Sequence, residues 1–231
     1  DADVTILAME RGAVDFVTKP TNIIEAKGDA FRKEILGILN AVLKTERISL
    51  TERRPAVAAV SAVQKRNASA ETRFKNKIVA LACSTGGPKA LQSVIPYLPA
   101  NLDAPMVLVQ HMPAGFTNSM ANRLDEISKI HVKEAENGEI LKKGTVYIAP
   151  GGKHMEVKKC PDGSHKIVYN DMPPIGGLKP CANITYDSLR TCGYDQVVCV
   201  VLTGMGADGT NGILELSKVK PSRRPVLGRQ H

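Results

Sequence analysis

The sequence has few of the residues and patterns that mark several protein classes. Its 231 residues include no tryptophan, only 4% aromatic residues and five cysteines. The cysteines form neither a CxxC pair nor a Cys/His ligand spacing, so we expect free thiols in a cytoplasmic protein and no metal site. No apolar run approaches the ~18 residues of a membrane-spanning helix, so membrane insertion is not expected. The first residues also lack the basic and apolar regions of a signal peptide.

The net charge of +8 comes from two short segments. Residues 44–77 hold nine basic and three acidic residues, and residues 218–231 hold five basic and no acidic residues. Neither segment interleaves the aromatic side chains that stack on bases, so nucleic-acid binding is not expected. A solvated linker and tail is the simpler interpretation, and a basic arm that contacts an acidic partner is the alternative.

Hydrophobic periodicity divides the chain into four parts. Residues 1–47 predict a helix over 3–11, a short strand over 14–17 and a second helix that Asn22 caps and that runs to about residue 47. Residues 48–76 lose this periodicity and predict an interdomain linker. Residues 77–217 form the main domain. Residues 218–231 form a basic tail that we expect to be poorly ordered, leaving the sheet without an edge strand.

The pattern over 77–217 is that of an α/β fold. Buried strands are expected at 78–82, 106–110, 144–149 and 197–202, because each is a continuous apolar run. Helical segments lie between them, and a turn at 161–163 predicts a β-hairpin of 155–159 with 165–169. This alternation predicts a doubly wound, mainly parallel sheet with helices on both faces.

Three polar residues follow three of these strands. Ser84 follows the first, His111 follows the second, and Asp208 lies in the loop after the last. In open α/β sheets, sites form at the carboxyl ends of the strands. If the strands are neighbours, a hydroxyl, an imidazole and a carboxylate meet there as nucleophile, base and orienting acid. Gly86 and Gly87 allow a sharp turn that projects Ser84.

Each of these residues also has a purely structural interpretation. Ser84 suits a helix cap, His111 a hydrogen-bonded core histidine, and Asp208 a cap for the helix that follows it. Cys83 is a rival nucleophile, although its place at the end of a buried strand favours the core. Residues 204–209 also match G-x-G-x-x-G, but the acidic residue that a dinucleotide site needs ~20 residues later is missing.

Four segments around these residues, in the same order and spacing, resemble the chemotaxis protein-glutamate methylesterases of the CheB family. The segments are 82–88, 109–113, 146–155 and 202–209. Residues 8–20 look like the final third of a response-regulator receiver domain, in which Lys19 matches the switch lysine. The resemblance therefore implies a receiver fragment over 1–47, a linker, and a methylesterase catalytic domain over 77–217.

The resemblance implies a serine hydrolase that demethylates glutamate methyl esters on the cytoplasmic helices of chemoreceptors, with deamidation of receptor glutamines as a second activity. Ser84, His111 and Asp208 match the family's nucleophile, base and orienter. The backbone N–H groups of Thr85 and Met205 match its oxyanion donors. No organic cofactor is implied. The implied partners are chemoreceptors and, through a full-length receiver domain, a chemotaxis histidine kinase.

The sequence departs from the family pattern at both ends. It begins after the receiver strands that carry the phosphoacceptor aspartate, and residues 218–231 match nothing in the family. We therefore expect a chain that is truncated at both ends. An alternative function is a catalytically inactive regulator that acts only as an interaction module.

Overall fold

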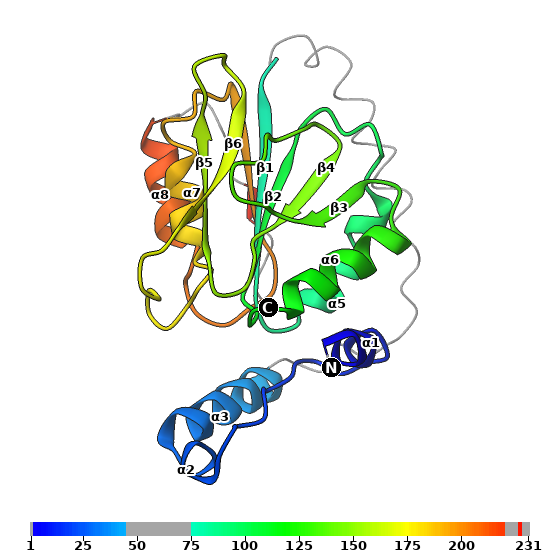
Figure 1. Ribbon diagram of the computed structural model, residues 1–231, viewed down its shortest axis with the longest axis vertical. Coiled ribbons are helices and arrows are strands. Elements are labelled where there is room, and N and C mark those ends of the chain that lie inside the picture. Colours follow the sequence, from blue (N-terminus) through cyan, green and yellow to red (C-terminus); the bar gives the residue numbers. More distant parts are fainter. Residues whose placement is uncertain (1, 45–74, 220–225, 228–231) are drawn as a thin grey trace.

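The structure is a computed structural model that describes residues 2–44, 75–219 and 226–227. An N-terminal helical segment lies at one end of an α/β body (Figure 1). That segment comprises α1 (Ala2–Glu10), α2 (Ile23–Ala26) and α3 (Asp29–Lys44). Within the described ranges, no helix combines the length and apolarity needed to cross a membrane.

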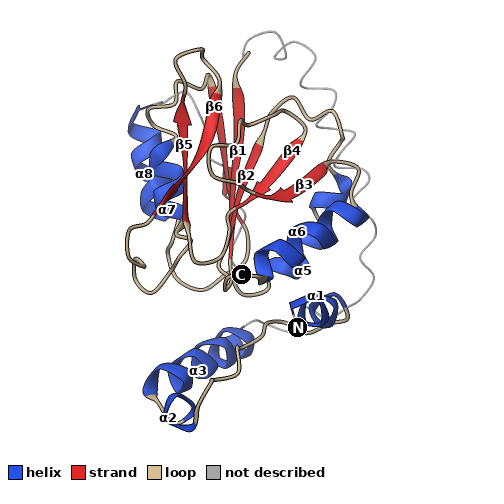
Figure 2. Ribbon diagram, viewed as in Figure 1, coloured by secondary structure: helices blue, strands red, loops and turns tan. Residues whose placement is uncertain are grey.

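Six parallel strands form the central sheet in the order β3-β4-β2-β1-β7-β8. Figure 2 shows β3, β4, β2 and β1 of this sheet side by side. They are β1 (Lys77–Cys83), β2 (Met106–Gln110), β3 (His131–Glu134), β4 (Thr145–Ile148), β7 (Gln196–Val201) and β8 (Val226–Leu227). An antiparallel hairpin of β5 (His154–Lys159) and β6 (His165–Asn170) stands apart from this sheet. The predicted parallel α/β sheet and the hairpin are confirmed.

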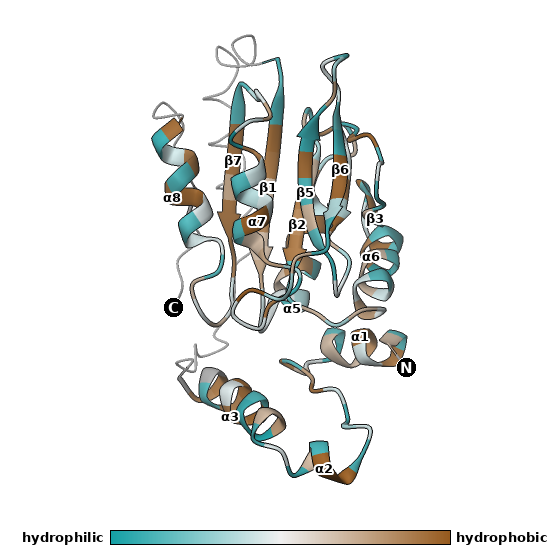
Figure 3. Cartoon of the chain, turned by 60° about the vertical axis from the view of Figure 1, so that its left-hand side comes forward, coloured by the Kyte–Doolittle hydropathy of each residue, from teal (hydrophilic) through white to brown (hydrophobic). Residues whose placement is uncertain are grey.

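Two hydrophobic cores lie on opposite faces of the sheet, because successive strand residues point to opposite sides. Ile78, Ala80 and Ala82 enter one core, whereas Leu81 and Cys83 enter the other. The helices of the α/β body are α5 (Gly87–Gln92), the 3-10 helix at Ile95–Tyr97, α6 (Phe116–Ile127), α7 (Ala182–Ser188) and α8 (Thr210–Val219). The central strands are hydrophobic along most of their length (Figure 3).

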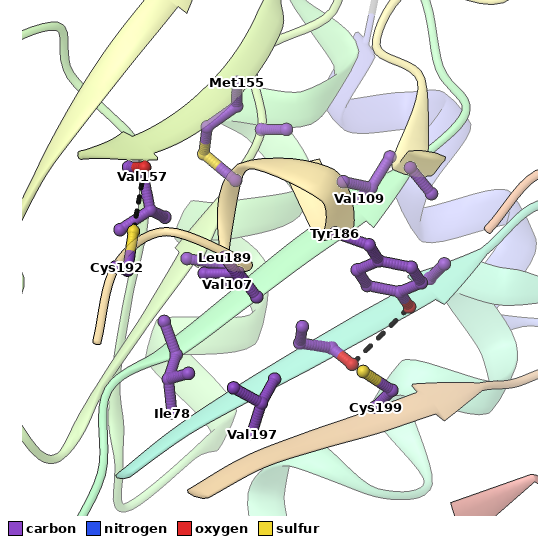
Figure 4. Packing of buried hydrophobic residues seen from close by; sticks show 14 of the residues in the cluster. Ile78, Val107, Val109, Met155, Val157, Tyr186, Leu189, Cys192, Val197 and Cys199 are labelled. Atoms are coloured by element: carbon purple, nitrogen blue, oxygen red, sulfur yellow. Dashed lines mark hydrogen bonds between the residues drawn. The ribbon is translucent and has the colours of Figure 1, made fainter. Parts of the chain in front are cut away.

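The first core lies under α7, α8 and the β5–β6 hairpin. Tyr186 of α7 lies in this core (Figure 4). Its hydroxyl lies 3.0 Å from the carbonyl oxygen of Val200 and 3.5 Å from that of Ala80. The second core lies under α5, α6 and α1, where Ile6 and Met9 of α1 are buried. Helices therefore cover both faces, as predicted, and α1 packs on the same body as the sheet.

The N-terminal expectations are correct only in part. The first helix and the Asn22 cap are confirmed, since the Asn22 side chain accepts the Glu25 N–H at 2.8 Å. The predicted strand over 14–17 is wrong: Phe16 stacks on Phe116 of α6, with ring centroids 4.5 Å apart, instead of pairing in a sheet. The predicted second helix is interrupted at Lys27 and Gly28, because glycine disfavours a helix interior.

Two strands were not expected. One of them is β3, which lies at an edge of the sheet and buries only Val132. The expectation of no edge strand beyond the last predicted one is wrong, because Val226 and Leu227 of the basic tail pair in parallel with Val200 and Val201. The first two residues of the predicted tail, Lys218 and Val219, end α8. The predicted linker, apart from residues 75 and 76, and residues 220–225 and 228–231 of the tail lie outside the described residues.

Candidate active site

The strand order brings the predicted site residues to one edge of the sheet. From the central strand β1, the sheet extends through β2 on one side and through β7 on the other. Cys83 pairs with Gln110, so Ser84 and His111 leave the sheet at the same level. Hydrogen bonds continue beyond the strands: the Ser84 N–H donates to the Thr203 carbonyl at 2.9 Å, and the His111 N–H donates to the Cys83 carbonyl at 3.2 Å.

The structure brings all three predicted side chains to one small pocket. Ser84, His111 and Asp208 line it together with Gly204 and Met205. The Nε2 atom of His111 lies 2.7 Å from the Asp208 Oδ2 atom, and both side chains are largely buried. A carboxylate can only accept here, so Nε2 carries the proton. Nδ1 is then the basic nitrogen, and this buried atom has no hydrogen-bond partner among the described residues.

Asp208 accepts four hydrogen bonds. Besides the His111 ring, it accepts the N–H groups of Ala182 at 2.6 Å and Asn183 at 3.0 Å and the Cys181 thiol at 3.1 Å. Burial acts to raise the pKa of Asp208, but these hydrogen bonds outweigh it and hold the pKa well below its ordinary value. The carboxylate is therefore ionised at neutral pH.

Asp208 does cap a helix, but not the one that follows it. Its carboxylate binds the first N–H groups of α7, which no side chain of α7 itself caps. The Asn183 side chain in turn accepts the N–H groups of Gly209 at 3.1 Å and Gly212 at 2.8 Å at the start of α8. These N–H groups would face a pyrophosphate in a dinucleotide site. Because the Asn183 side chain already bonds these N–H groups, they are not available to a phosphate, which argues against a dinucleotide site at residues 204–209.

Two loops present Ser84 and two free donors: the turn after β1 carries Ser84 and Thr85, and the loop after β7 carries Met205. Gly86, with φ of 73°, is the N-cap of α5, so Ser84 is not its cap. In the described part of the chain, the Ser84 hydroxyl and the N–H groups of Thr85 and Met205 have no hydrogen-bond partner. A Cβ on Gly204 would lie 2.8 Å from the Ser84 Cβ, so this approach of the two loops requires glycine at position 204.

Cys83 is not placed to act as a nucleophile. It is 4% exposed, packs in the core under α5 and α6, and donates a hydrogen bond to the Gln110 Oε1 atom at 3.0 Å. Burial raises the pKa of its thiol far above the ordinary value, so the thiol stays protonated at neutral pH. The prediction that Cys83 faces the core is confirmed.

The chain is similar to a known protein family over the part that carries this site. The CheB methylesterase family matches residues 79–221, which are more than half of the chain. The chain belongs to the CheB methylesterase family. A solved CheB structure, the methylesterase catalytic domain of Thermotoga maritima, is 42% identical with a TM-score of 0.61. That alignment covers 66% of this chain and 78% of the Thermotoga chain.

Curated CheB relatives agree with this assignment. A protein-glutamate methylesterase/protein-glutamine glutaminase of Geobacillus kaustophilus is 42% identical over 94% of this chain and 61% of its own length. A protein of the same name from Pyrococcus horikoshii is also 42% identical, over 94% of this chain and 58% of its own length. The chain thus spans about three fifths of the length of these relatives.

Sequence reasoning missed the groups that hold Asp208. Cys181, Ala182 and Asn183 contribute chiefly main-chain donors, and a main-chain group has no sequence signature. His154, which lies in the segment 146–155 that resembles the CheB family, is fully buried. Its Nδ1 accepts the Cys181 N–H at 3.2 Å, and its Nε2 donates to the Pro173 carbonyl at 3.1 Å. It therefore holds the loop that leads into α7. No three His, Cys, Asp or Glu side chains in the described ranges are grouped to hold a metal ion.

Proposed function

We propose that this chain is a serine hydrolase that removes methyl groups from glutamate methyl esters. The observation that carries the proposal is the His111–Asp208 pair at 2.7 Å in a pocket that Ser84 also lines, with the His111 Nδ1 atom left without a partner among the described residues. This arrangement supports Ser84 as nucleophile, His111 as general base and Asp208 as the group that orients the ring.

In the first half of the reaction, the Ser84 Oγ atom attacks the ester carbonyl while His111 Nδ1 takes the hydroxyl proton. The C=O electron pair moves to the oxygen, which becomes an oxyanion. The free N–H groups of Thr85 and Met205 are suited to stabilise it. When the oxyanion collapses, the bond to the methoxy group breaks and that group leaves as methanol with the proton from His111.

In the second half, water hydrolyses the glutamyl ester on Ser84. His111 Nδ1 takes a proton from the water, whose oxygen attacks the acyl carbon and again forms an oxyanion. Collapse breaks the bond to Ser84, which regains the proton, and releases the glutamate product. The net reaction converts one ester and one water into one carboxylic acid and one methanol. A glutamine side chain would react in the same way, with ammonia as the leaving group, which fits the second activity in the relatives' name.

For the substrate, we propose methylated glutamates on the cytoplasmic helices of chemoreceptors, with a role in chemotactic adaptation. The CheB family assignment supports this substrate class. We also propose that residues 1–47 derive from a response-regulator receiver domain, with 48–76 as linker and 77–217 as the catalytic domain. In a chain with the full receiver domain, the phosphate donor would be the chemotaxis histidine kinase.

The test uses a helical peptide with one glutamate γ-methyl ester, and the assay measures methanol. The wild-type chain is expected to release one methanol per ester, and Ser84→Ala to lower the rate by at least about 10³-fold. Cys83→Ala is the matched control, because it removes the neighbouring thiol but leaves the proposed nucleophile.

Equal rates for Ser84→Ala and wild type would contradict the assignment of the nucleophile. Peptide binding by the wild-type chain without methanol release would instead favour the interaction module, and release of ammonia from a matched glutamine peptide would add the second activity.

A further inference from the structure

Gln110 bridges the two residues that we propose as nucleophile and base. It ends β2, is 2% exposed and lies beside the end of β1. Its Nε2 donates to the carbonyl oxygens of Ser84 and His111, both at 3.1 Å, while its Oε1 accepts the Cys83 thiol at 3.0 Å. Both amide N–H bonds are thus used on the backbones of the two reactive residues. Since a carbonyl oxygen only accepts, these contacts also fix which end of the amide is nitrogen.

The contact with Ser84 has a consequence for the neighbouring donor. The Ser84–Thr85 peptide bond is trans and planar, so the Ser84 C=O and the Thr85 N–H point in opposite directions. The Ser84 carbonyl is held from two sides, by Gln110 and by the Gly87 N–H at 2.7 Å. Holding the carbonyl therefore sets the direction of the Thr85 N–H, which is one of the two N–H groups proposed above to stabilise the oxyanion.

The contact with His111 acts on the other strand. The His111 N–H already bonds the Cys83 carbonyl, and the Gln110 amide bonds the His111 carbonyl. The backbone of His111 is thus tied on both sides at the end of β2. A single side chain thus bonds the backbone carbonyl groups of both Ser84 and His111.

Gly87 leaves the space that this amide occupies. A Cβ added at position 87 would lie 2.0 Å from the Gln110 Oε1 atom and 3.1 Å from the Cys83 Cβ. Any other residue there would displace the amide or move the start of α5. The sequence places a glycine where the bridge between the two strand ends requires one.

We propose that Gln110 is a positioning residue that aims the Thr85 N–H at the developing oxyanion and keeps Ser84 in register with His111. The proposal rests on the hydrolase function proposed above. The Gln110 amide is buried behind Ser84 and His111 and does not contact the substrate. We therefore expect its loss to lower kcat and to leave KM unchanged.

The test compares Gln110→Met, which keeps the length but loses all three hydrogen bonds, with Tyr147→Phe. Tyr147 is a matched control: it is 1% exposed on β4, and its hydroxyl accepts the Lys142 N–H at 2.9 Å in another part of the sheet. We expect Gln110→Met to lower kcat about 10- to 100-fold with KM within twofold of wild type, since a misaimed oxyanion donor acts on the transition state. Tyr147→Phe is expected to leave both constants within twofold.

Gln110→Glu adds a readout that general destabilisation would not produce. The neutral acid keeps one donor, whereas the carboxylate would face two carbonyl oxygens that it cannot bond. We therefore expect the ratio of variant to wild-type kcat to fall as pH rises, while circular dichroism stays that of a folded protein. Gly87→Ala displaces the amide from the other side and is expected to show the same loss of kcat.

Three results would overturn the proposal: wild-type kcat in Gln110→Met, an equal loss in Tyr147→Phe, or a pH-independent kcat ratio for Gln110→Glu. If the wild-type chain releases no methanol, the proposed function fails, and the rate at which a fluorophosphonate labels Ser84 replaces kcat. That reaction needs the same nucleophile, base and oxyanion donors, so an unchanged labelling rate in Gln110→Met would still refute the positioning role.

Discussion

Replacing Asp208 by asparagine should cost both activity and stability, because this carboxylate orients His111 and caps α7. Each of its two oxygens accepts two hydrogen bonds. Oδ2 accepts the His111 Nε2–H and the Ala182 N–H, while Oδ1 accepts the Asn183 N–H and the Cys181 thiol. Asparagine replaces one oxygen by an NH₂ group, which is a donor. In either orientation of the amide, two donors face that NH₂ group and lose their partner.

The magnitude follows from these contacts. A buried donor without a partner costs about 1–3 kcal/mol, so two of them lower the free energy of unfolding by roughly 2–6 kcal/mol. At about 2–4 °C per kcal/mol for a domain of this size, Tm is expected to fall by roughly 4–24 °C. Loss of the orienting carboxylate is expected to lower kcat by about 10³- to 10⁴-fold.

Ser84→Ala is the matched control, because the Ser84 hydroxyl has no hydrogen-bond partner within the described residues. It should abolish ester hydrolysis and leave Tm within about 2 °C of wild type. Thermal denaturation followed by circular dichroism gives both values of Tm. If Asp208→Asn melted with wild-type Tm, the capping of α7 by this carboxylate would be refuted; if it kept wild-type kcat, its orienting role would be refuted.

Three further predictions concern pH, the glycine beside the site and the thiols. Although burial opposes it, hydrogen bonding holds the pKa of Asp208 below its unfolded value of ~3.9, so its stabilisation is complete above about pH 5 and declines as pH falls through the lower folded pKa. Urea denaturation should therefore show the gap between wild type and Asp208→Asn narrowing from about pH 6 to pH 2.5; a constant gap contradicts this. Gly204→Ala would place a Cβ 2.8 Å from the Ser84 Cβ, and steady-state kinetics should show at least a tenfold lower kcat; an unchanged kcat would mean that the loops tolerate separation. Iodoacetamide on the folded protein should label Cys160, which is partly exposed, and spare the four buried cysteines, as peptide mass mapping would show; rapid labelling of Cys83 would contradict its place in the core.

The edge of the sheet that carries the candidate site was predictable from the sequence because strand ends are predictable. Strands buried on both faces appear as continuous apolar runs, and Ser84 and His111 directly follow two of them. The parallel topology then brings the two residues together. Asp208 lies farther from its strand, and its position depends on the α7 backbone, which carries no side-chain signal.

The elements that were missed depend on tertiary contacts. Residues 14–17 have the composition of a strand, yet Phe16 packs on Phe116 and no neighbouring strand in the described residues pairs with them. In β3 only Val132 is buried, so its pattern is too weak to predict an edge strand. The contacts of Gln110 could not be predicted either, because its two acceptors are main-chain carbonyl groups that follow the ends of two different strands.

The most direct test of the central claim is to identify the residue that a fluorophosphonate modifies in the folded chain. Mass spectrometry of the digested protein should find one adduct, on Ser84, and its rate of formation should fall at least about 100-fold in His111→Ala. An adduct on another residue, no adduct at all, or equal rates in wild type and His111→Ala would contradict Ser84 as a nucleophile that His111 activates.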